Sequence, residues 1–262
     1  MSQVHDAAGL AIAKRIVVKV GSSSISGVNE GKIDALVAAL AAAHKRGAEV
    51  VLVSSGAIAT GMPLLNLESK PEDLPTSQAL ASVGQSRLIA RYQTSLEQFG
   101  IIAGQILLTS GDLEGEDTRA NAAKALGRLL ELRVLPIVNE NDTVATQEIR
   151  FGDNDRLAAL VAILVDADAL VLLSDVDALY DMPPTKDDAK RIERVEFDDD
   201  LAWVEVGGTS TGVGTGGAVT KVSAAKLANE AGIGVLLTSA DFVAKALAGE
   251  SLGTWFAAAT ER

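Results

Sequence analysis

Runs of apolar residues predict strands at intervals along the chain. Arg15–Val20, Glu49–Val53 and Ile101–Leu108 are short and rich in aliphatic, often β-branched residues. Continuous apolar runs of this length are typical of strands buried on both faces of a parallel sheet. Three later segments have the same character: RVLPIVN (133–139), DALVLLSD (168–175) and GVLLTSA (234–240).

Between these strands, apolar residues recur at helical spacing. One stripe follows the first strand and consists of Ile33, Leu36, Val37 and Leu40. Gly47 is placed to end that helix. Thr76 is expected to cap a second helix. Its apolar face would consist of Leu80, Val83, Leu88, Tyr92 and Leu96. Two more helices are predicted by LAALVAILV (157–165) and KVSAAKLANEA (221–231).

The alternation predicts an α/β protein, a three-layer αβα sandwich with a mainly parallel central sheet. No internal domain boundary is evident, and residues 181–191, DMPPTKDDAKR, are interpreted as a surface loop or small insertion. We expect residues 1–13 to form a flexible extension and residues 14–262 to form a single domain.

Composition limits the functions open to this fold. The chain has 262 residues, 48% of them hydrophobic, with a net charge of −12 and no cysteine. The charge argues against nucleic acid or an anionic membrane as partner, and the lack of cysteine excludes thiolate chemistry. No apolar run approaches the roughly 20 residues of a membrane span. We therefore expect a soluble, cytoplasmic protein.

In parallel sheets, ligands bind beyond the carboxyl ends of the strands. Four polar segments lie at such junctions: KVGSSS (19–24), SSGAIATG (54–61), NENDTVAT (139–146) and LSDVDALY (173–180). These segments are the first candidates for a functional site.

Two lysines are candidates for contact with an anion. Lys221 follows the glycine-rich stretch TSTGVGTGG (209–217), whose backbone N–H groups could converge on a phosphate. The alternative is a flexible surface loop, since the spacing does not match GxxxxGK[ST]. Lys19 interrupts an apolar strand, where a buried lysine would need a nearby anion. Its alternative is an edge-strand lysine that reaches solvent.

Ser55 and Gly56 follow a predicted strand and could present a hydroxyl and backbone amides to a carboxylate or phosphate, or could simply cap a helix. A Ser-His-Asp hydrolase is improbable, because neither His5 nor His44 has a persuasive acid and serine context.

The clusters NEND (139–142) and GDND (152–155) concentrate short acids and amides at the same end of the sheet. Their oxygens suit an amino group, a lysine or hydrated Mg²⁺. In the alternative interpretation, Asp153 or Asn154 is a helix cap and Asp142 is a turn residue.

Together these motifs resemble the glutamate 5-kinases of the amino-acid kinase family. The resemblance starts near Arg15 and is carried in order by KVGSSS, SSGAIATG, ASVGQSRL, NENDTVAT, FGDNDRLAAL, LLSDVDALY and GVGTGGAVTKVSAA. It implies the amino-acid kinase fold and transfer of the γ-phosphoryl group of ATP to L-glutamate, the first step of proline biosynthesis.

The resemblance also implies residue roles. Lys19 and Lys221 would meet the transferring phosphoryl group, with Asp155 as their organiser. The glutamate-binding positions would be Ser55, Gly56, Asp142, Asp153 and Asn154. The ATP-binding positions would be Lys19, Gly21, Ser174, Asp175, Thr215, Gly216, Gly217, Ala218, Val219, Thr220 and Lys221. Mg²⁺ is expected to accompany the nucleotide, with no metal site formed by the protein alone.

Further expectations concern partners and regulation. The family implies inhibition by L-proline, a homodimer or homotetramer, and coupling to the reductase that uses glutamyl phosphate. Many relatives continue into a PUA domain, which we do not expect here. Two other functions remain open: a sister kinase acting on another carboxylate or carbamate, and a catalytically silent amino-acid sensor.

Overall fold

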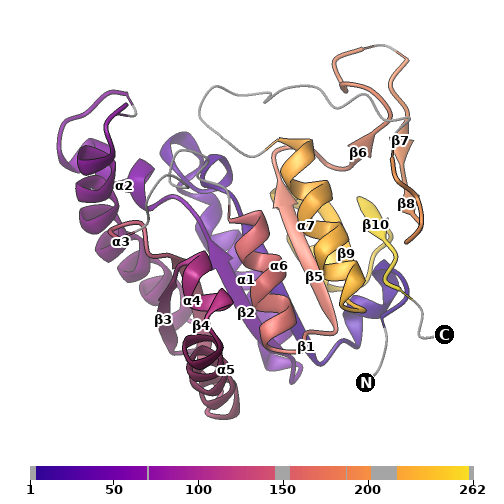
Figure 1. Ribbon diagram of the computed structural model, residues 1–262, viewed down its shortest axis with the longest axis horizontal. Coiled ribbons are helices and arrows are strands. Elements are labelled where there is room, and N and C mark those ends of the chain that lie inside the picture. The colour runs from indigo at the N-terminus through magenta and orange to yellow at the C-terminus, as the bar shows by residue number, and fades with distance from the viewer. Residues whose placement is uncertain (1–3, 70, 145–153, 187, 202–216, 260–262) are drawn as a thin grey trace.

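The computed structural model describes residues 4–69, 71–144, 154–186, 188–201 and 217–259. Its main sheet consists of β1 (Arg15–Val20), β2 (Glu49–Ser54), β3 (Ala103–Leu108), β4 (Leu135–Glu140), β5 (Ala169–Ser174), β8 (Arg194–Val195), β9 (Gly234–Ser239) and β10 (Thr254–Phe256). The strand order is β3-β4-β2-β1-β5-β9-β10-β8. All neighbours are parallel except β9 and β10 (Figure 1).

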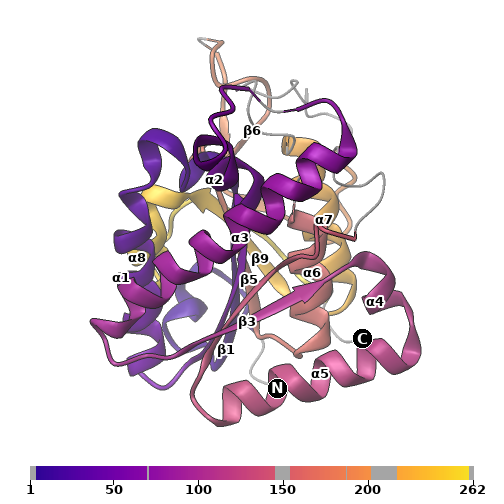
Figure 2. The same cartoon turned by 90° about the vertical axis from the view of Figure 1, so that its left-hand side faces the viewer.

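Helices cover both faces of this sheet (Figure 2). One face packs against η1 (Ala7–Ala11), α1 (Lys32–Lys45), α3 (Leu74–Glu97) and α8 (Val243–Leu247). The other packs against α4 (Ser110–Glu114), α5 (Glu116–Glu131), α6 (Asp155–Leu164) and α7 (Ala218–Glu230). The expected αβα sandwich with a mainly parallel sheet is therefore confirmed.

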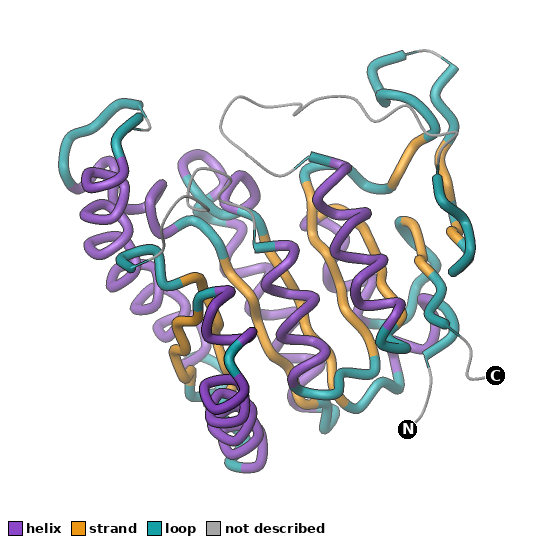
Figure 3. The backbone as a smooth tube through the Cα atoms, in the orientation of Figure 1, coloured by secondary structure: helices purple, strands orange, loops and turns teal. Residues whose placement is uncertain are grey.

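Shorter elements join these layers, as the tube in Figure 3 shows. They are α2 (Ala57–Leu64), η2 (Ser22–Ser24), η3 (Gly27–Asn29), η5 (Ala240–Phe242), β6 (Leu179–Tyr180) and β7 (Arg191–Ile192). The strands β6 and β7 pair in an antiparallel manner at the base of the excursion over residues 181–191.

Side chains along β1 point alternately to the two faces of the sheet, and this alternation determines the face on which Lys19 lies. Ile16 and Val18 pack into the core beneath α1 and α3, whereas Val17 packs into the core beneath α6 and α7. Because side chains of a strand alternate between faces, Lys19 points to the same side as Val17. Lys19 therefore lies on the face that carries α6 and α7.

Two glycines bring α2 and α3 into unusually close contact. A Cβ atom at Gly84 would lie 1.8 Å from Ala57 O, and one at Gly61 would lie 2.2 Å from Leu80 O. Any larger residue would have to push the helices apart. The turn that precedes α2 is thus held at a fixed distance from α3.

The structure corrects details of one predicted strand and one predicted helix. The strand expected at Ile101–Leu108 begins at Ala103 and lies at the edge of the sheet, with Leu107 37% exposed. Within the described residues its one neighbouring strand is β4, and five of its six residues are not fully buried. The cap of α3 is Asp73, whose Oδ1 accepts from Thr76 N at 2.8 Å. Val83, expected on the apolar face of this helix, is 39% exposed.

The expectation of a flexible extension over residues 1–13 is wrong for residues 4–13. Val4, Ala7, Leu10 and Ala13 are all buried in the core beneath α1 and α8. Ala7 and Leu10 lie within η1, where a spacing of three residues matches the period of a 3₁₀-helix and places them on one side. The guanidinium of Arg46 also donates to Leu10 O at 2.7 Å. Residues 1–3 lie outside the described part of the chain.

Candidate active site

Lys19 enters the site from the middle of the sheet. The strand β1 is paired with β2 on one side and β5 on the other, and Lys19 is only 2% exposed. Its Nζ lies 2.5 Å from Asp155 Oδ1. The alternative of an edge-strand lysine that reaches solvent is therefore wrong.

Asp155 joins Lys19 to a second lysine. It is the first residue of α6 and is fully buried. Its Oδ2 lies 3.1 Å from Lys221 Nζ and accepts from Thr220 Oγ1 at 3.1 Å. A carboxylate at the start of a helix is favoured by the helix dipole. Residues from β1, α6 and α7 thus meet at one carboxylate, and we call Lys19, Asp155 and Lys221 the charged cluster.

Burial of the charged cluster is costly unless it is paired. Moving charged groups out of water carries a penalty of several kcal/mol per ion, which close pairing only offsets. Apolar residues of similar volume often stabilise a core equally well or better. Ionisable groups that are buried together at the carboxyl end of a sheet therefore indicate a functional site. They do not by themselves indicate a more stable fold.

The described residues among those expected to bind ATP come from the ends of β1 and β5 and the start of α7. A Cβ atom at Gly21 would lie 3.7 Å from Lys19 Nζ, so this position borders the amine. Ser174 is the last residue of the neighbouring strand β5, Asp175 follows it, and Ser174 Oγ donates to Asp175 Oδ1 at 3.1 Å. The helix α7 opens with Ala218, Val219, Thr220 and Lys221, after Gly217 at its cap. Thr215 and Gly216 lie outside the described residues.

On the other side of Asp155, the strand β2 ends in the turn Ser55–Gly56. Gly56 has φ of +102°, a conformation that favours glycine, and its Cβ would lie 3.0 Å from Ser26 Oγ. Ser55 is 5% exposed, and its Oγ has no hydrogen-bond partner among the described residues. The cap position of α2 is Gly56, with no side-chain capping bond. Helix capping therefore does not explain Ser55.

Asn154 is tied to this turn through its side chain. Its Nδ2 donates to Ser54 O at 2.6 Å and to Asn139 Oδ1 at 2.7 Å. Although Asn154 occupies the cap position of α6, it makes no capping hydrogen bond. The alternative of an ordinary helix cap is therefore wrong for Asn154.

The neutral network continues toward α3. Asn139 Nδ2 donates to Gln85 Oε1 at 2.6 Å, and we call Gln85, Asn139 and Asn154 the amide chain. Sequence reasoning quoted Asn139 and Gln85 within motifs but assigned neither to the site. The available signal was the motif ASVGQSRL, where Gln85 follows the glycine at the contact between α2 and α3.

A buried tyrosine also supports the end of β2. Ser54 Oγ donates to Ser55 O at 3.1 Å, so the Tyr92 hydroxyl, 2.9 Å from Ser54 Oγ, acts as donor to it. Burial raises the pKa of the Tyr92 hydroxyl, which keeps it protonated as this role requires.

Asp142 lies in the turn Asn141–Val144, two residues beyond β4, as the turn alternative anticipated. The turn is anchored by Asn141 N, which donates to Leu108 O at 2.9 Å. The remaining expected site residue, Asp153, lies outside the described residues.

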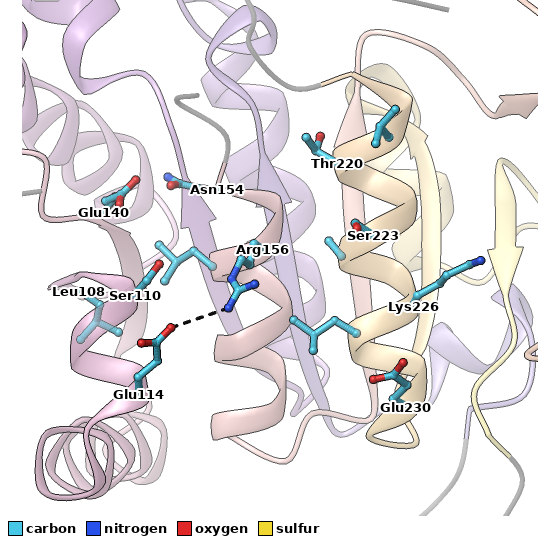
Figure 4. Close-up of a pocket in the computed structure, with 14 residues that line it drawn as sticks. Leu108, Ser110, Glu114, Glu140, Asn154, Arg156, Thr220, Ser223, Lys226 and Glu230 are labelled. Carbon is cyan, nitrogen blue, oxygen red and sulfur yellow. Dashed lines mark ion pairs between the residues drawn. The ribbon is translucent and has the colours of Figure 1, made fainter. Parts of the chain in front are cut away.

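A cavity of about 820 Å³ lies beside the site, between α4, α6 and α7 (Figure 4). Asn154, Glu140 and Thr220 lie at its upper end, next to the residues described above. Farther along, Arg156 approaches Glu114 at 3.9 Å.

Within the described residues, no group of three or more His, Cys, Asp or Glu side chains is arranged to hold a metal ion. The same part of the chain contains no helix with the length and apolar character needed to cross a membrane.

Comparisons with known proteins show the family of this chain. Residues 14–239 match the Amino acid kinase family. The chain is 71% identical over 250 residues to a protein named glutamate 5-kinase from Clavibacter sepedonicus, covering 95% of this chain and 96% of that protein. It is 62% identical over 259 residues to the glutamate 5-kinase of Leifsonia xyli subsp. xyli, covering 98% and 96%.

A third relative is longer. The glutamate 5-kinase of Streptomyces avermitilis is 56% identical over 254 residues, which are 95% of this chain and 68% of that protein. Among solved structures, carbamate kinase from Giardia lamblia bound to AMP-PNP has a TM-score of 0.66 at 17% identity, covering 95% of this chain and all of that one. At this identity the likeness concerns the fold alone.

Proposed function

This chain belongs to the amino acid kinase family, and on that premise we propose that it is a glutamate 5-kinase. It would transfer the γ-phosphoryl group of ATP to the side-chain carboxylate of L-glutamate, forming L-glutamyl 5-phosphate for proline biosynthesis. The observation that carries this proposal is the convergence of Lys19 and Lys221 on Asp155, beside the turn at Ser55.

The two lysines have the role of charge stabilisation. Phosphoryl transfer spreads negative charge over the transferring oxygens, and fixed cations that meet this charge lower the barrier. Asp155 is 2.5 Å from one ammonium group and 3.1 Å from the other, so it fixes the position of both. Asp155 is a positioning residue, and the lysines are the catalytic residues.

We assign recognition of the amino acid to the side of the site that contains Ser55 and Asn154. Ser55 offers a buried hydroxyl, and Asn154 offers its carbonyl oxygen, since both hydrogens of its amide are already donated. We assign Asp142 and Asp153 to the amino group of glutamate, and Gly56 to close approach of the backbone. The acceptor carboxylate is ionised near neutral pH, so it attacks without a general base.

Nucleotide binding is assigned to the ends of β1 and β5 and the start of α7. Gly21, Ser174, Asp175 and the first turn of α7 line this side, with Thr215 and Gly216 included in the assignment. The donor set fits a magnesium nucleotide, because two lysines and a helix start offer cationic and N–H donors to phosphates. Mg²⁺ supplies charge neutralisation of those phosphates when bound.

The first experiment is an acceptor assay with the purified protein, Mg-ATP and hydroxylamine, which traps an acyl phosphate as a hydroxamate. L-Glutamate, L-aspartate, N-acetyl-L-glutamate and no acceptor are compared. We expect hydroxamate and ADP to form in equal amounts with L-glutamate only. Preference for another acceptor would identify a sister kinase, and glutamate binding without any hydroxamate would identify a sensor.

Regulation and assembly extend the proposal. We include inhibition by L-proline, a homodimer or homotetramer, supply of product to the reductase that uses glutamyl phosphate, a cytoplasmic location, and a single catalytic domain over residues 14–262. The support is the relationship to glutamate 5-kinases. Titration of the acceptor assay with L-proline and light scattering of the purified chain test the first two.

A further inference from the structure

The direction of each amide in the amide chain is fixed by backbone groups. Asn154 faces Ser54 O at 2.6 Å, and a carbonyl oxygen can only accept, so the facing atom must be Nδ2. At the other end, Glu140 N donates to Asn139 at 2.9 Å, so the atom that receives it must be Oδ1. Neither side chain can be turned over without placing like groups together.

These two constraints leave one orientation for the whole chain. Asn139 Oδ1 accepts from both Glu140 N and Asn154 Nδ2, so its own Nδ2 must point away from them. That nitrogen is 2.6 Å from Gln85 Oε1, which supplies its acceptor. Asn139 is 2% exposed and Asn154 is 4% exposed, so water has little access as a substitute.

We propose that Gln85 is a positioning residue for amino-acid recognition, acting through Asn139 on the orientation of Asn154. The inference rests on the proposed function, because it assigns Asn154 Oδ1 to the substrate. Without Gln85, Asn139 Nδ2 loses its acceptor, and only Glu140 N and Asn154 Nδ2 still hold the Asn139 amide. Asn139 Oδ1 is then positioned less firmly for Asn154 Nδ2, so the direction of Asn154 Oδ1 is held less tightly.

Gln85 suits this task because its helix is held rigidly. Its neighbour Gly84 lies against Ala57 O, at the start of the helix that follows the Ser55–Gly56 turn. Tyr92 lies seven residues farther along α3, on the same side of the helix, and bonds Ser54 Oγ at 2.9 Å. One helix therefore contacts both the amide chain and the end of β2.

The test replaces Gln85 by methionine, which keeps the length of the side chain and removes the acceptor. Loss of one neutral hydrogen bond predicts a rise of about fivefold in the KM and Kd for L-glutamate. The kcat and the KM for ATP should stay within about twofold of wild type. Q85E retains an acceptor facing Asn139 Nδ2 and should restore glutamate affinity to near the wild-type value.

Gln93 provides the matched control on the same helix. Its Oε1 accepts from Ala103 N at 2.9 Å, so Q93M also removes a hydrogen bond between α3 and the sheet, away from the amide chain. We expect Q93M to leave glutamate affinity unchanged. If Q85M does not fold, Q85A is measured in its place.

Binding is measured by calorimetry with L-glutamate alone, and turnover by the hydroxamate assay. If the wild type bound glutamate without turnover, the proposed kinase activity would be refuted. The ratio of the Kd values of Q85M and wild type for L-glutamate would still test the role of Gln85. Equal glutamate affinity in Q85M and wild type would overturn the inference. So would an equal loss in Q93M, failure of Q85E to restore affinity, or no glutamate binding by the wild type.

Discussion

The two halves of the candidate site differ in the charge of their side chains. The charged cluster uses three ionised side chains from β1, α6 and α7, held at 2.5 and 3.1 Å. The amide chain uses three neutral side chains from α3, β4 and α6, held at 2.6 and 2.7 Å. Asp155 and Asn154 are adjacent in sequence, so the start of α6 is where the two halves meet.

The contrast shows how one fold separates catalysis from recognition. Charges in a buried site interact strongly with charge that develops during reaction, so the charged cluster is suited to the transition state. Amides cannot change protonation, and their direction is fixed by donors and acceptors on either side. They are suited to holding a ground-state ligand in a single pose.

Asp155→Asn should have the largest effect, because it leaves two buried ammonium groups without their carboxylate. We expect the free energy of unfolding to fall by about 3 kcal/mol or more. Under conditions where the variant is folded, kcat should fall by about 10²–10³. Urea unfolding and the hydroxamate assay measure these quantities.

Glu131→Gln is the control for that change. It alters a carboxylate in the same way, but its pair with Arg128 is on the surface, where both side chains are more than half exposed. Its effect on unfolding should be below about 1 kcal/mol. If both variants lost the same free energy of unfolding, the buried charged cluster would matter no more for stability than a surface ion pair, which would contradict this account.

Lys221→Ala should reduce kcat by about 10² or more, since it removes a cation that acts mainly on the transition state. Lys226→Ala, on the same helix, removes a partly exposed lysine that donates to Asp200 O at 2.9 Å, and should retain wild-type kcat. Steady-state assays at saturating ATP and glutamate compare them. A kcat for Lys221→Ala equal to that of the control would remove Lys221 from the mechanism.

Asp142→Ala should raise the KM for glutamate by about tenfold or more, because hydrogen bonds to charged groups are worth more than neutral ones. The kcat should change much less. Thr143→Ala, at the next position of the same turn, is exposed and serves as control. Unchanged glutamate KM in Asp142→Ala would show that the NEND cluster has another role.

Gly84→Ala tests whether the amide chain depends on the contact between α2 and α3. The added methyl group would meet Ala57 O, so overpacking should lower the free energy of unfolding by about 1–3 kcal/mol. A rise in glutamate KM with little change in kcat should accompany it. Gly127→Ala on α5 has open space around the new methyl group and should stabilise the protein by about 0.5–1 kcal/mol.

Local sequence patterns were sufficient for the sandwich and for Lys19 and Lys221 as candidates, whereas Asp155 entered through the resemblance to the family. The strand that carries Lys19 and the helices that carry Asp155 and Lys221 all show clear periodicity, and motifs at their ends marked the chemistry. The order of strands is not a local property, which is why the edge position of β3 was missed. The packing of residues 4–13 involves η1, a 3₁₀-helix of five residues, which is too short to give a clear periodic pattern.

Gln85 shows where sequence reasoning stops. Its partner Asn139 is 54 residues away, and Gln85 lies next to Gly84, which is in close contact with Ala57 at the start of α2. Gly84 does not reveal its partner helix in the sequence. The hydrogen bond from Asn154 to Ser54 likewise spans 100 residues.

The most direct test of this division of labour is calorimetric binding of L-glutamate to the wild type, Lys221→Ala and Asp142→Ala. We predict that Lys221→Ala binds glutamate within about twofold of wild type while Asp142→Ala binds it about tenfold or more weakly. If Lys221→Ala lost as much affinity as Asp142→Ala, catalysis and recognition would not be tasks of separate residues, and the account would be contradicted.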